Sequence, residues 1–209
     1  PVQDLSAAVA ACRDPSFARG TCERTRRFEL MHKYIPILAL PLTLAGCVYP
    51  DPPGGAPMAL LNSSGQQVGT VTAYQSGGGV TFKLEASGLP HGVHGLHVHA
   101  VGRCDGPDFK SAGGHWNPQA KMHGLNNPKG PHAGDLSNVT VAANGVMSTT
   151  ATLANADLTT PSGVPGALLD SDGAALVLHA QADDYSTDPS GNSGDRIACA
   201  VLVPTAVRY

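Results

Sequence analysis

Aromatic and charged residues are scarce in this sequence. Aromatic side chains make up 5% of its 209 residues and charged side chains 14%, whereas glycine occurs 25 times and proline 17 times. Because glycine and proline disfavour helix interiors, and valine, threonine and alanine are abundant, the composition favours short strands and turns over long helices. The length suits one folded domain with appended segments.

Positive charge is also scarce in the main part of the chain. From residue 47 onward, seven lysines and arginines stand against twelve acidic residues, whereas residues 1–46 hold six against four. Nucleic-acid binding needs clustered lysine and arginine to neutralise phosphates. We therefore predict no nucleic-acid partner, and an anionic substrate would need a local positive group to guide it.

The sequence also lacks an apolar run that suits a transmembrane helix. The run after Met31-His32-Lys33 is too short to span a bilayer and contains Pro36 and Pro41. A short basic start, an apolar stretch and small residues before Cys47 are instead typical of a signal peptide, which we predict over residues 31–46.

The flanking segments suggest how the rest of the chain is divided. Residues 1–30 lack an apolar period that could form a core, and we interpret them as an upstream extension of a start at Met31; a small folded or disordered leader is the alternative. Residues 47–57 are rich in proline and glycine and are predicted to form a short, semi-extended tether. The folded domain is expected over residues 58–209.

Strand-like runs alternate with turn signals through the expected domain. The runs lie at 58–62, 67–74, 80–86, 93–100, 135–142, 146–153, 174–180 and 197–203. About eight short strands predict an all-β sandwich or flattened barrel. The connections 101–134 and 181–196 are too long for simple turns, and long irregular segments in a compact domain are usually functional.

Histidines gather in these runs and connections. His97 and His99 stand two apart in a strand-like run, so their side chains point to the same face. Such a pair taken alone is more often a surface or core feature than a metal site. However, His179 ends a later apolar run, and the first long connection adds His115, His123, His132 and Asp135. Because neutral imidazole suits zinc and copper, and a carboxylate completes a zinc site, we predict a metal centre.

The motifs that hold these residues resemble the copper/zinc superoxide dismutase family over roughly residues 58–205. They are Val93-His94-Gly95-Leu96-His97-Val98-His99, Gly113-Gly114-His115-Trp116-Asn117-Pro118, His132-Ala133-Gly134-Asp135-Leu136 and Gly194-Asp195-Arg196-Ile197-Ala198-Cys199. Their joint order and spacing make the resemblance highly specific. It implies an all-β fold, namely an eight-stranded Greek-key barrel or sandwich with two long loops that carry the metals and the active site.

The resemblance also implies two metals that share one ligand. The expected copper ligands are His97, His99, His115 and His179, and the expected zinc ligands are His115, His123, His132 and Asp135. The implied activity is dismutation of superoxide to oxygen and hydrogen peroxide by a redox-cycling copper with a structural zinc.

Further residues gain roles from the same resemblance. Asp183 is expected to accept hydrogen bonds from the copper ligand His97 and the zinc ligand His123. Arg196 is expected near copper, where it would attract and orient superoxide. His115 and Arg196 are the expected catalytic residues. His94 is expected to be structural.

Three of the five cysteines gain roles by resemblance, whereas Cys12 and Cys22 belong to the expected upstream extension. Cys104 and Cys199 resemble a disulfide that pins the metal-bearing loop to the barrel. The segment Leu44-Ala45-Gly46-Cys47 resembles a bacterial lipobox, which implies lipidation of Cys47 and a place on the periplasmic side of the envelope, at the outer membrane. Membrane contact is then expected only through this anchor; a plain secretory signal is the alternative. A homodimer and a monomer both fit the sequence.

Three other interpretations remain open at this stage. A non-catalytic periplasmic copper/zinc-binding protein on the same fold would need neither a bridging His115 nor an anion guide such as Arg196. A zinc hydrolase needs an open zinc position and a general base, whereas the expected zinc set is closed. A copper-only relative would lack the zinc ligands.

Overall fold

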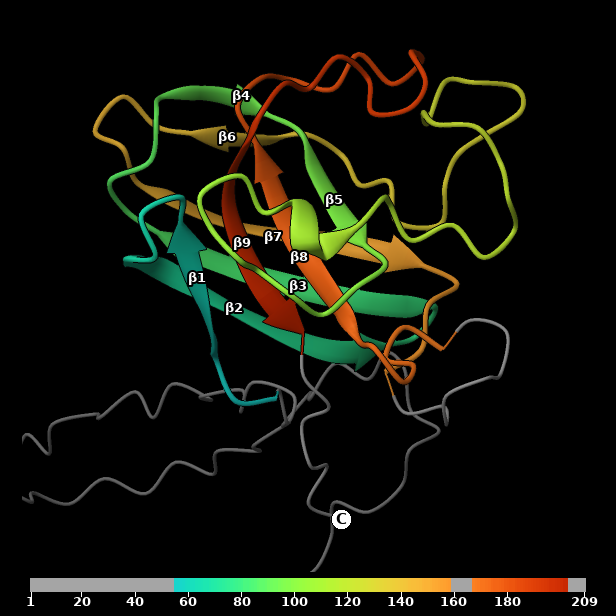
Figure 1. The fold of residues 1–209 in the computed structure, drawn as a ribbon, viewed down its shortest axis with the longest axis horizontal. Helices are drawn as coiled ribbons and strands as arrows, with labels where there is room; N and C mark the ends of the chain where they lie inside the picture. The colour runs from blue at the N-terminus through green and yellow to red at the C-terminus, as the bar shows by residue number, and fades with distance from the viewer. Residues whose placement is uncertain (1–54, 159–166, 203–209) are drawn as a thin grey trace, which may run out of the picture. The chain divides into compact units, whose positions relative to one another are not determined.

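The computed structural model describes residues 55–158 and 167–202 (Figure 1). The expected leader, signal peptide and Cys47 lie outside the described residues, as do most of the expected tether and the end of the expected domain. Within the described ranges, no helix has both the length and the apolar character needed to cross a membrane.

Strands make up almost all of the regular structure. They are β1 (Met58–Asn62), β2 (Gln67–Ser76), β3 (Gly79–Ala86), β4 (Gly92–His94), β5 (Leu96–His99), β6 (Val139–Val141), β7 (Met147–Ala154), β8 (Ala174–His179) and β9 (Arg196–Leu202). The one helix in the described part of the chain is a 3₁₀ turn, η1 (Lys110–Ala112). Because β4 and β5 are two halves of one run interrupted at Gly95, the strands correspond to the eight predicted runs.

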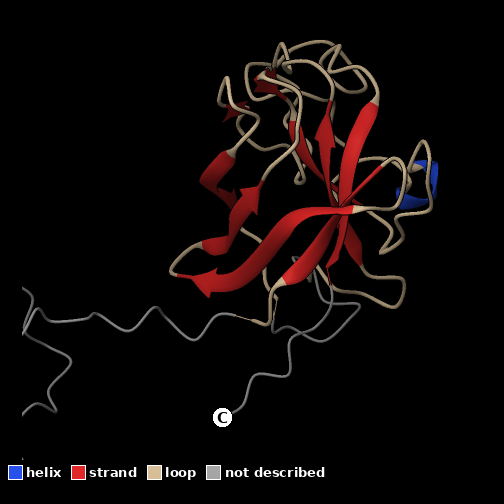
Figure 2. Ribbon diagram, turned by 90° about the vertical axis from the view of Figure 1, so that its left-hand side faces the viewer, coloured by secondary structure: helices blue, strands red, loops and turns tan. Residues whose placement is uncertain are grey.

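The strands form a curled antiparallel sheet. Seven of them pair in the order β5-β8-β9-β1-β2-β3-β7, and β4 pairs with β6. The order returns close to its start, since β4 leads into β5 and the Ala142 N–H at the β6–β7 turn donates to the Val146 carbonyl oxygen (2.9 Å). Figure 2 shows the strands curving around a common interior. The predicted all-β Greek-key architecture is confirmed.

Burial of alternate side chains explains the strands. On β3, Phe82 and Leu84 are buried whereas Lys83 and Glu85 are exposed, and each fully buried large apolar side chain contributes about 1.5–3 kcal/mol. By contrast, β8 is buried along its whole length. A second buried cluster explains this difference, because it covers the outer face of β8 with side chains from the first long connection; its members are Phe109, Ala112, Ala175, Val177 and Cys199.

The first long connection is tied to β5 by main-chain hydrogen bonds. The Val98 N–H donates to the Gly134 carbonyl oxygen, and the Trp116 N–H donates to the Val98 carbonyl oxygen, both at 2.8 Å. A Cβ at Gly134 would overlap the Val98 carbonyl oxygen, so this close approach requires glycine. Two separate stretches of the connection are thereby brought beside β5.

β6 is shorter than the predicted run 135–142. Asp135 forms a short bridge with His97 of β5. The Asn138 side chain donates to the Asp183 carbonyl oxygen and accepts the Asp183 N–H, both at 2.8 Å. These contacts take the first residues of the run out of the ladder and place them at the metal centre.

Candidate metal centre

Four histidines converge beside β5 and β8. His97 and His99 project from β5 and His179 ends β8. His115 comes from the first long connection, where a short bridge pairs it with His99. One ring nitrogen of each residue lies within 4.8 Å of the other three. We call these four residues the copper group.

The converging nitrogens of the copper group lack a hydrogen-bond partner among the described residues; they are His97 Nδ1, His99 Nε2, His115 Nε2 and His179 Nε2. In three rings the opposite nitrogen donates to an oxygen: His97 to Asp183 (2.8 Å), His99 to the Gly113 carbonyl (2.9 Å) and His179 to the Gly194 carbonyl (3.2 Å). A donating nitrogen carries the hydrogen of a neutral ring, so the converging nitrogen presents a lone pair. Such a set of imidazole nitrogens fits copper.

A second set of donors surrounds one oxygen of Asp135. The Nδ1 atoms of His115, His123 and His132 lie 2.9, 3.0 and 3.3 Å from Asp135 Oδ1, and those of His115 and His132 are 3.3 Å apart. Ligands of a tetrahedral zinc ion with bonds of about 2.0–2.1 Å stand roughly 3.3 Å from one another. Both the spacing and the residue types fit zinc, and we call this set the zinc group.

His115 belongs to both groups through different nitrogens. Its Nε2 faces the copper group and its Nδ1 faces Asp135. His97 also approaches the second group, within 4.8 Å of His115, His123 and Asp135. However, its Nε2 is already committed to Asp183, and its Nδ1 is the nitrogen turned toward the copper group. The geometry therefore divides the donors around one shared ring.

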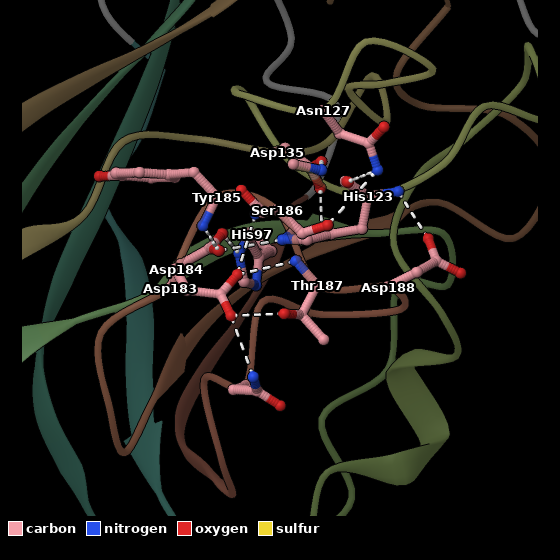
Figure 3. Close-up of polar contacts among 12 residues, drawn as sticks. His97, His123, Asn127, Asp135, Asp183, Asp184, Tyr185, Ser186, Thr187 and Asp188 are labelled. Atoms are coloured by element: carbon pink, nitrogen blue, oxygen red, sulfur yellow. Dashed lines mark hydrogen bonds and ion pairs between the residues drawn. The ribbon is translucent and has the colours of Figure 1, made fainter.

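Asp183 connects the two groups (Figure 3). One carboxylate oxygen accepts the His97 Nε2–H at 2.8 Å, and the other accepts the His123 Nε2–H at 3.0 Å. Gly191, with φ +63°, packs so close that a Cβ there would overlap Asp183 Oδ1. The buried carboxylate thereby orients one ring of each group.

Burial keeps the copper group neutral. It lowers the pKa of His99 to about 2, and it lowers the pKa values of His115 and His179 to about 4. Neighbouring histidines add to the effect because two positive rings repel one another. Neutral rings are the form that binds a metal ion.

The zinc group has the opposite electrostatic balance. Burial opposes charge on His123, but hydrogen bonds to Asp135 and Asp183 outweigh burial and raise the pKa of His123 to about 9. Burial likewise favours protonation of the two carboxyl groups, yet hydrogen bonds from the histidines hold both of their pKa values well below the usual range. Both carboxyl groups are therefore ionised at neutral pH.

Arg196 lies at the edge of the copper group. It pairs with His179 across the β8–β9 ladder, and its guanidinium donates to the carbonyl oxygens of Phe109 and Gly113, both at 2.7 Å. It lines an open cleft of about 500 Å³ together with Lys110, Asp108 and Asp195. Arginine stays charged at any physiological pH, so the Arg196 guanidinium gives this edge of the copper group a fixed positive charge that can attract a small anion.

The expected disulfide is present between Cys104 and Cys199, whose Cα atoms are 5.7 Å apart. Cys199 lies on β9 and is buried against Phe109 and Ala112. The bond therefore fixes the stretch of chain whose carbonyl oxygens hold Arg196.

Two other histidines and the motif tryptophan lie outside both donor groups. The His94 ring is buried between the carbonyl oxygens of His179 and Pro90, 2.8 and 2.9 Å from its nitrogens. His91 is exposed. Trp116 is 7% exposed and packs in the core of the barrel.

Two residues that the sequence analysis did not single out also contact the centre. Asn138 holds the main chain of Asp183, and Asp188 accepts the His123 main-chain N–H at 2.6 Å. In the sequence, the one feature that pointed to these two residues was their position in or beside the two long connections, close to expected ligands.

Comparison with known proteins agrees with this geometry. The family model described as copper/zinc superoxide dismutase (SODC) matches residues 67–202. Superoxide dismutase [Cu-Zn] 1 of Aquifex aeolicus is 44% identical over 144 residues, which cover 68% of this chain and 84% of the relative. A superoxide dismutase-like protein of Bacillus subtilis is 40% identical over 193 residues, covering 83% and 97%.

Solved structures show the same likeness. The crystal structure of a SOD-like protein from Bacillus subtilis has a TM-score of 0.67 and 42% identity, and the match covers 71% of this chain and 99% of that chain. The Cu/Zn superoxide dismutase from Brucella abortus has a TM-score of 0.57 and 28% identity, with the same coverage of 71% and 99%. The stretch matched by the family model contains both donor groups, Asp183 and Arg196.

Proposed function

The chain belongs to the copper/zinc superoxide dismutase family, and we propose that it converts two superoxide anions and two protons into oxygen and hydrogen peroxide at the centre built around His115. The observation that carries this proposal is the division of the His115 ring, in which one nitrogen faces the copper group and the other faces the zinc group. The proposed ligands are the members of these two groups. A protein that only stores metals has no need of a shared ring.

The residues of the chain have distinct tasks in this proposal. Bound copper supplies the one-electron oxidation and reduction, which zinc cannot. His115 Nε2 holds a proton between the two half-reactions and gives it to the reduced product. Asp183 keeps the rings of His97 and His123 oriented. Arg196 attracts and orients the anion in a chain whose residues from 47 onward carry a net negative charge.

A superoxide assay on the chain loaded with both metals tests this function. We expect rapid dismutation by the loaded protein, a large loss in His115→Ala, and no change in the control His91→Ala, whose ring is exposed and outside both groups. Metal analysis of the same samples should find copper and zinc in equal amounts.

Two results would replace the proposal by an alternative. If the protein retains both metals but does not accelerate dismutation, it is a copper/zinc-binding protein without this activity. The Bacillus relative is named superoxide dismutase-like, which is the reason to test this alternative. Copper without zinc after loading with both would indicate a copper-only relative.

We propose further that the chain is an exported lipoprotein that protects the cell envelope from superoxide, as a monomer or homodimer. The support is the signal-like stretch 31–46 followed by Cys47. Mass spectrometry of the native N-terminus tests this, because the mature chain should begin at a Cys47 that carries lipid. A mature chain that begins elsewhere, or an unmodified cysteine, would overturn it.

A further inference from the structure

Asp188 connects the two long loops of the molecule. It belongs to the connection between β8 and β9, yet its Oδ1 accepts the main-chain N–H of His123, in the first long connection, at 2.6 Å (Figure 3). This bond spans 65 positions of the sequence. It fixes the backbone of a zinc-group residue from outside that residue's own loop.

The same carboxylate oxygen faces a second zinc-group histidine. Asp188 Oδ1 lies 4.0 Å from His132 Nε2, which is the nitrogen opposite the one that approaches Asp135. When Nδ1 of a neutral imidazole binds a metal, Nε2 carries the hydrogen. At 4.0 Å no hydrogen bond forms, but a negative charge on that side polarises the ring N–H and makes the ring a better ligand.

We propose that Asp188 is a positioning residue of the zinc group, which holds the His123 backbone and polarises the His132 ring. This inference rests on the zinc site of the proposed function. It adds a second carboxylate to the role of Asp183, which contacts His123 but reaches the copper group instead of His132. Through Asp188, the loop that leads to Arg196 and the loop that carries the zinc donors are ordered together.

Two variants separate the two contacts. Asp188→Asn keeps an oxygen that can accept the His123 N–H but removes the negative charge, whereas Asp188→Ala removes both. Because the Asp188 side chain is 42% exposed, solvent weakens its effect, and we expect zinc to bind about tenfold more weakly in Asp188→Ala and about threefold more weakly in Asp188→Asn. Copper affinity should be unchanged in both.

Asp184→Ala is the matched control. The Asp184 carboxylate accepts hydrogen bonds from Ser186, Thr187 and Asn192 within the same loop, and none of these partners is a histidine. This variant should loosen the loop and leave zinc affinity unchanged. The zinc dissociation constant is measured by competition with a chelator, and the visible spectrum of the cobalt-substituted protein reports the geometry of the site; thermal unfolding verifies that each variant is folded.

Equal weakening of zinc binding by Asp184→Ala and Asp188→Ala would overturn the proposal, because loop order alone would then set the affinity. Wild-type affinity and an unchanged cobalt spectrum in both Asp188 variants would overturn it as well. A wild-type protein that binds zinc without dismuting superoxide would contradict the proposed function and leave this inference standing.

Discussion

Arg196 donates a 2.7 Å hydrogen bond from Nη2 to the carbonyl oxygen of Gly113. The same oxygen accepts the Nδ1–H of His99 at 2.9 Å. A single main-chain oxygen therefore positions both the cation that attracts the substrate and one ring of the copper group. Main-chain oxygens hold both nitrogens of the guanidinium, so the fold fixes where the Arg196 charge lies beside the copper group.

Replacement of Arg196 should reduce steering of the substrate. We expect Arg196→Gln to slow dismutation about tenfold at low ionic strength, and to flatten the dependence of the rate on salt, because attraction between charges is what salt screens. The control is Arg103→Gln, since Arg103 is 65% exposed and pairs with Asp105. Rates measured over a range of ionic strength test this; an unchanged rate for Arg196→Gln at low salt would contradict it.

A side chain at Gly191 should displace Asp183. Gly191→Ala places a Cβ against Asp183 Oδ1 and within 2.8 Å of His123 Nε2. The control Gly65→Ala has a similar positive φ, +75°, but no atom within 4 Å of the added carbon. Both variants should lose about 1 kcal/mol through backbone strain, and Gly191→Ala should lose a further ~1–3 kcal/mol through overlap.

Urea unfolding of the two glycine variants measures these losses, and the copper electron paramagnetic resonance spectrum reports the site itself. That spectrum should change in Gly191→Ala alone. Equal stability losses together with identical spectra would show that Asp183 does not depend on the space that Gly191 leaves.

The metal-free protein should be most stable near pH 6.5. The pKa of His99 is about 2 and those of His115 and His179 are about 4, against a usual 6.5. Below pH 6.5 the unfolded chain therefore binds more protons than the folded chain, and stability falls as pH decreases. The pKa of His123 is about 9. Its contribution is complete below pH 6.5 and is lost as pH rises toward 9.

Urea unfolding of metal-free protein across this range checks the pH optimum. The fall on the acid side should be the steeper one, because the pKa values of all four copper-group rings are lowered, whereas one ring contributes on the alkaline side. A free energy of unfolding that keeps rising from pH 6.5 to 9 would contradict the charge assigned to His123.

Removal of the disulfide should weaken both the fold and the active site. The bond joins residues 95 positions apart, and closing a loop of that length contributes at most about 4–5 kcal/mol. We expect the double variant Cys104→Ser and Cys199→Ser to unfold at lower urea concentration. Because the nearby Phe109 carbonyl oxygen holds Arg196, the salt dependence of its rate should also flatten; a wild-type salt dependence would show that the disulfide acts on stability alone.

Much of the fold could be predicted because the local residue pattern indicates each strand. The alternation of buried and exposed side chains on β3 can be read without knowledge of distant residues. The start of β6 could not be predicted, because Asp135 and Asn138 are drawn out of the ladder by partners on β5 and beyond β8. A local sequence pattern does not show that partners far away in the sequence will compete with the strand for these residues.

The metal-binding side chains can be recognised in the sequence, whereas the groups that hold them in position cannot. Imidazole and carboxylate side chains at motif spacing identify the expected ligands. The oxygens of Phe109, Gly113 and Gly194 that hold the arginine and two of the rings belong to the main chain, and every residue has such an oxygen. Asp188 is one of several aspartates in its stretch, and only the folded chain shows that it reaches His123.

The two donor groups stand on different kinds of structure. Three of the four copper-group histidines, and Arg196, are carried by the neighbouring strands β5, β8 and β9. All four zinc-group residues lie in the irregular first connection between β5 and β6, and one of them is His115, the ring that both groups share. Changes in that connection would therefore alter every zinc donor but only one copper donor, His115, so copper binding should tolerate remodelling of the loop better than zinc binding does.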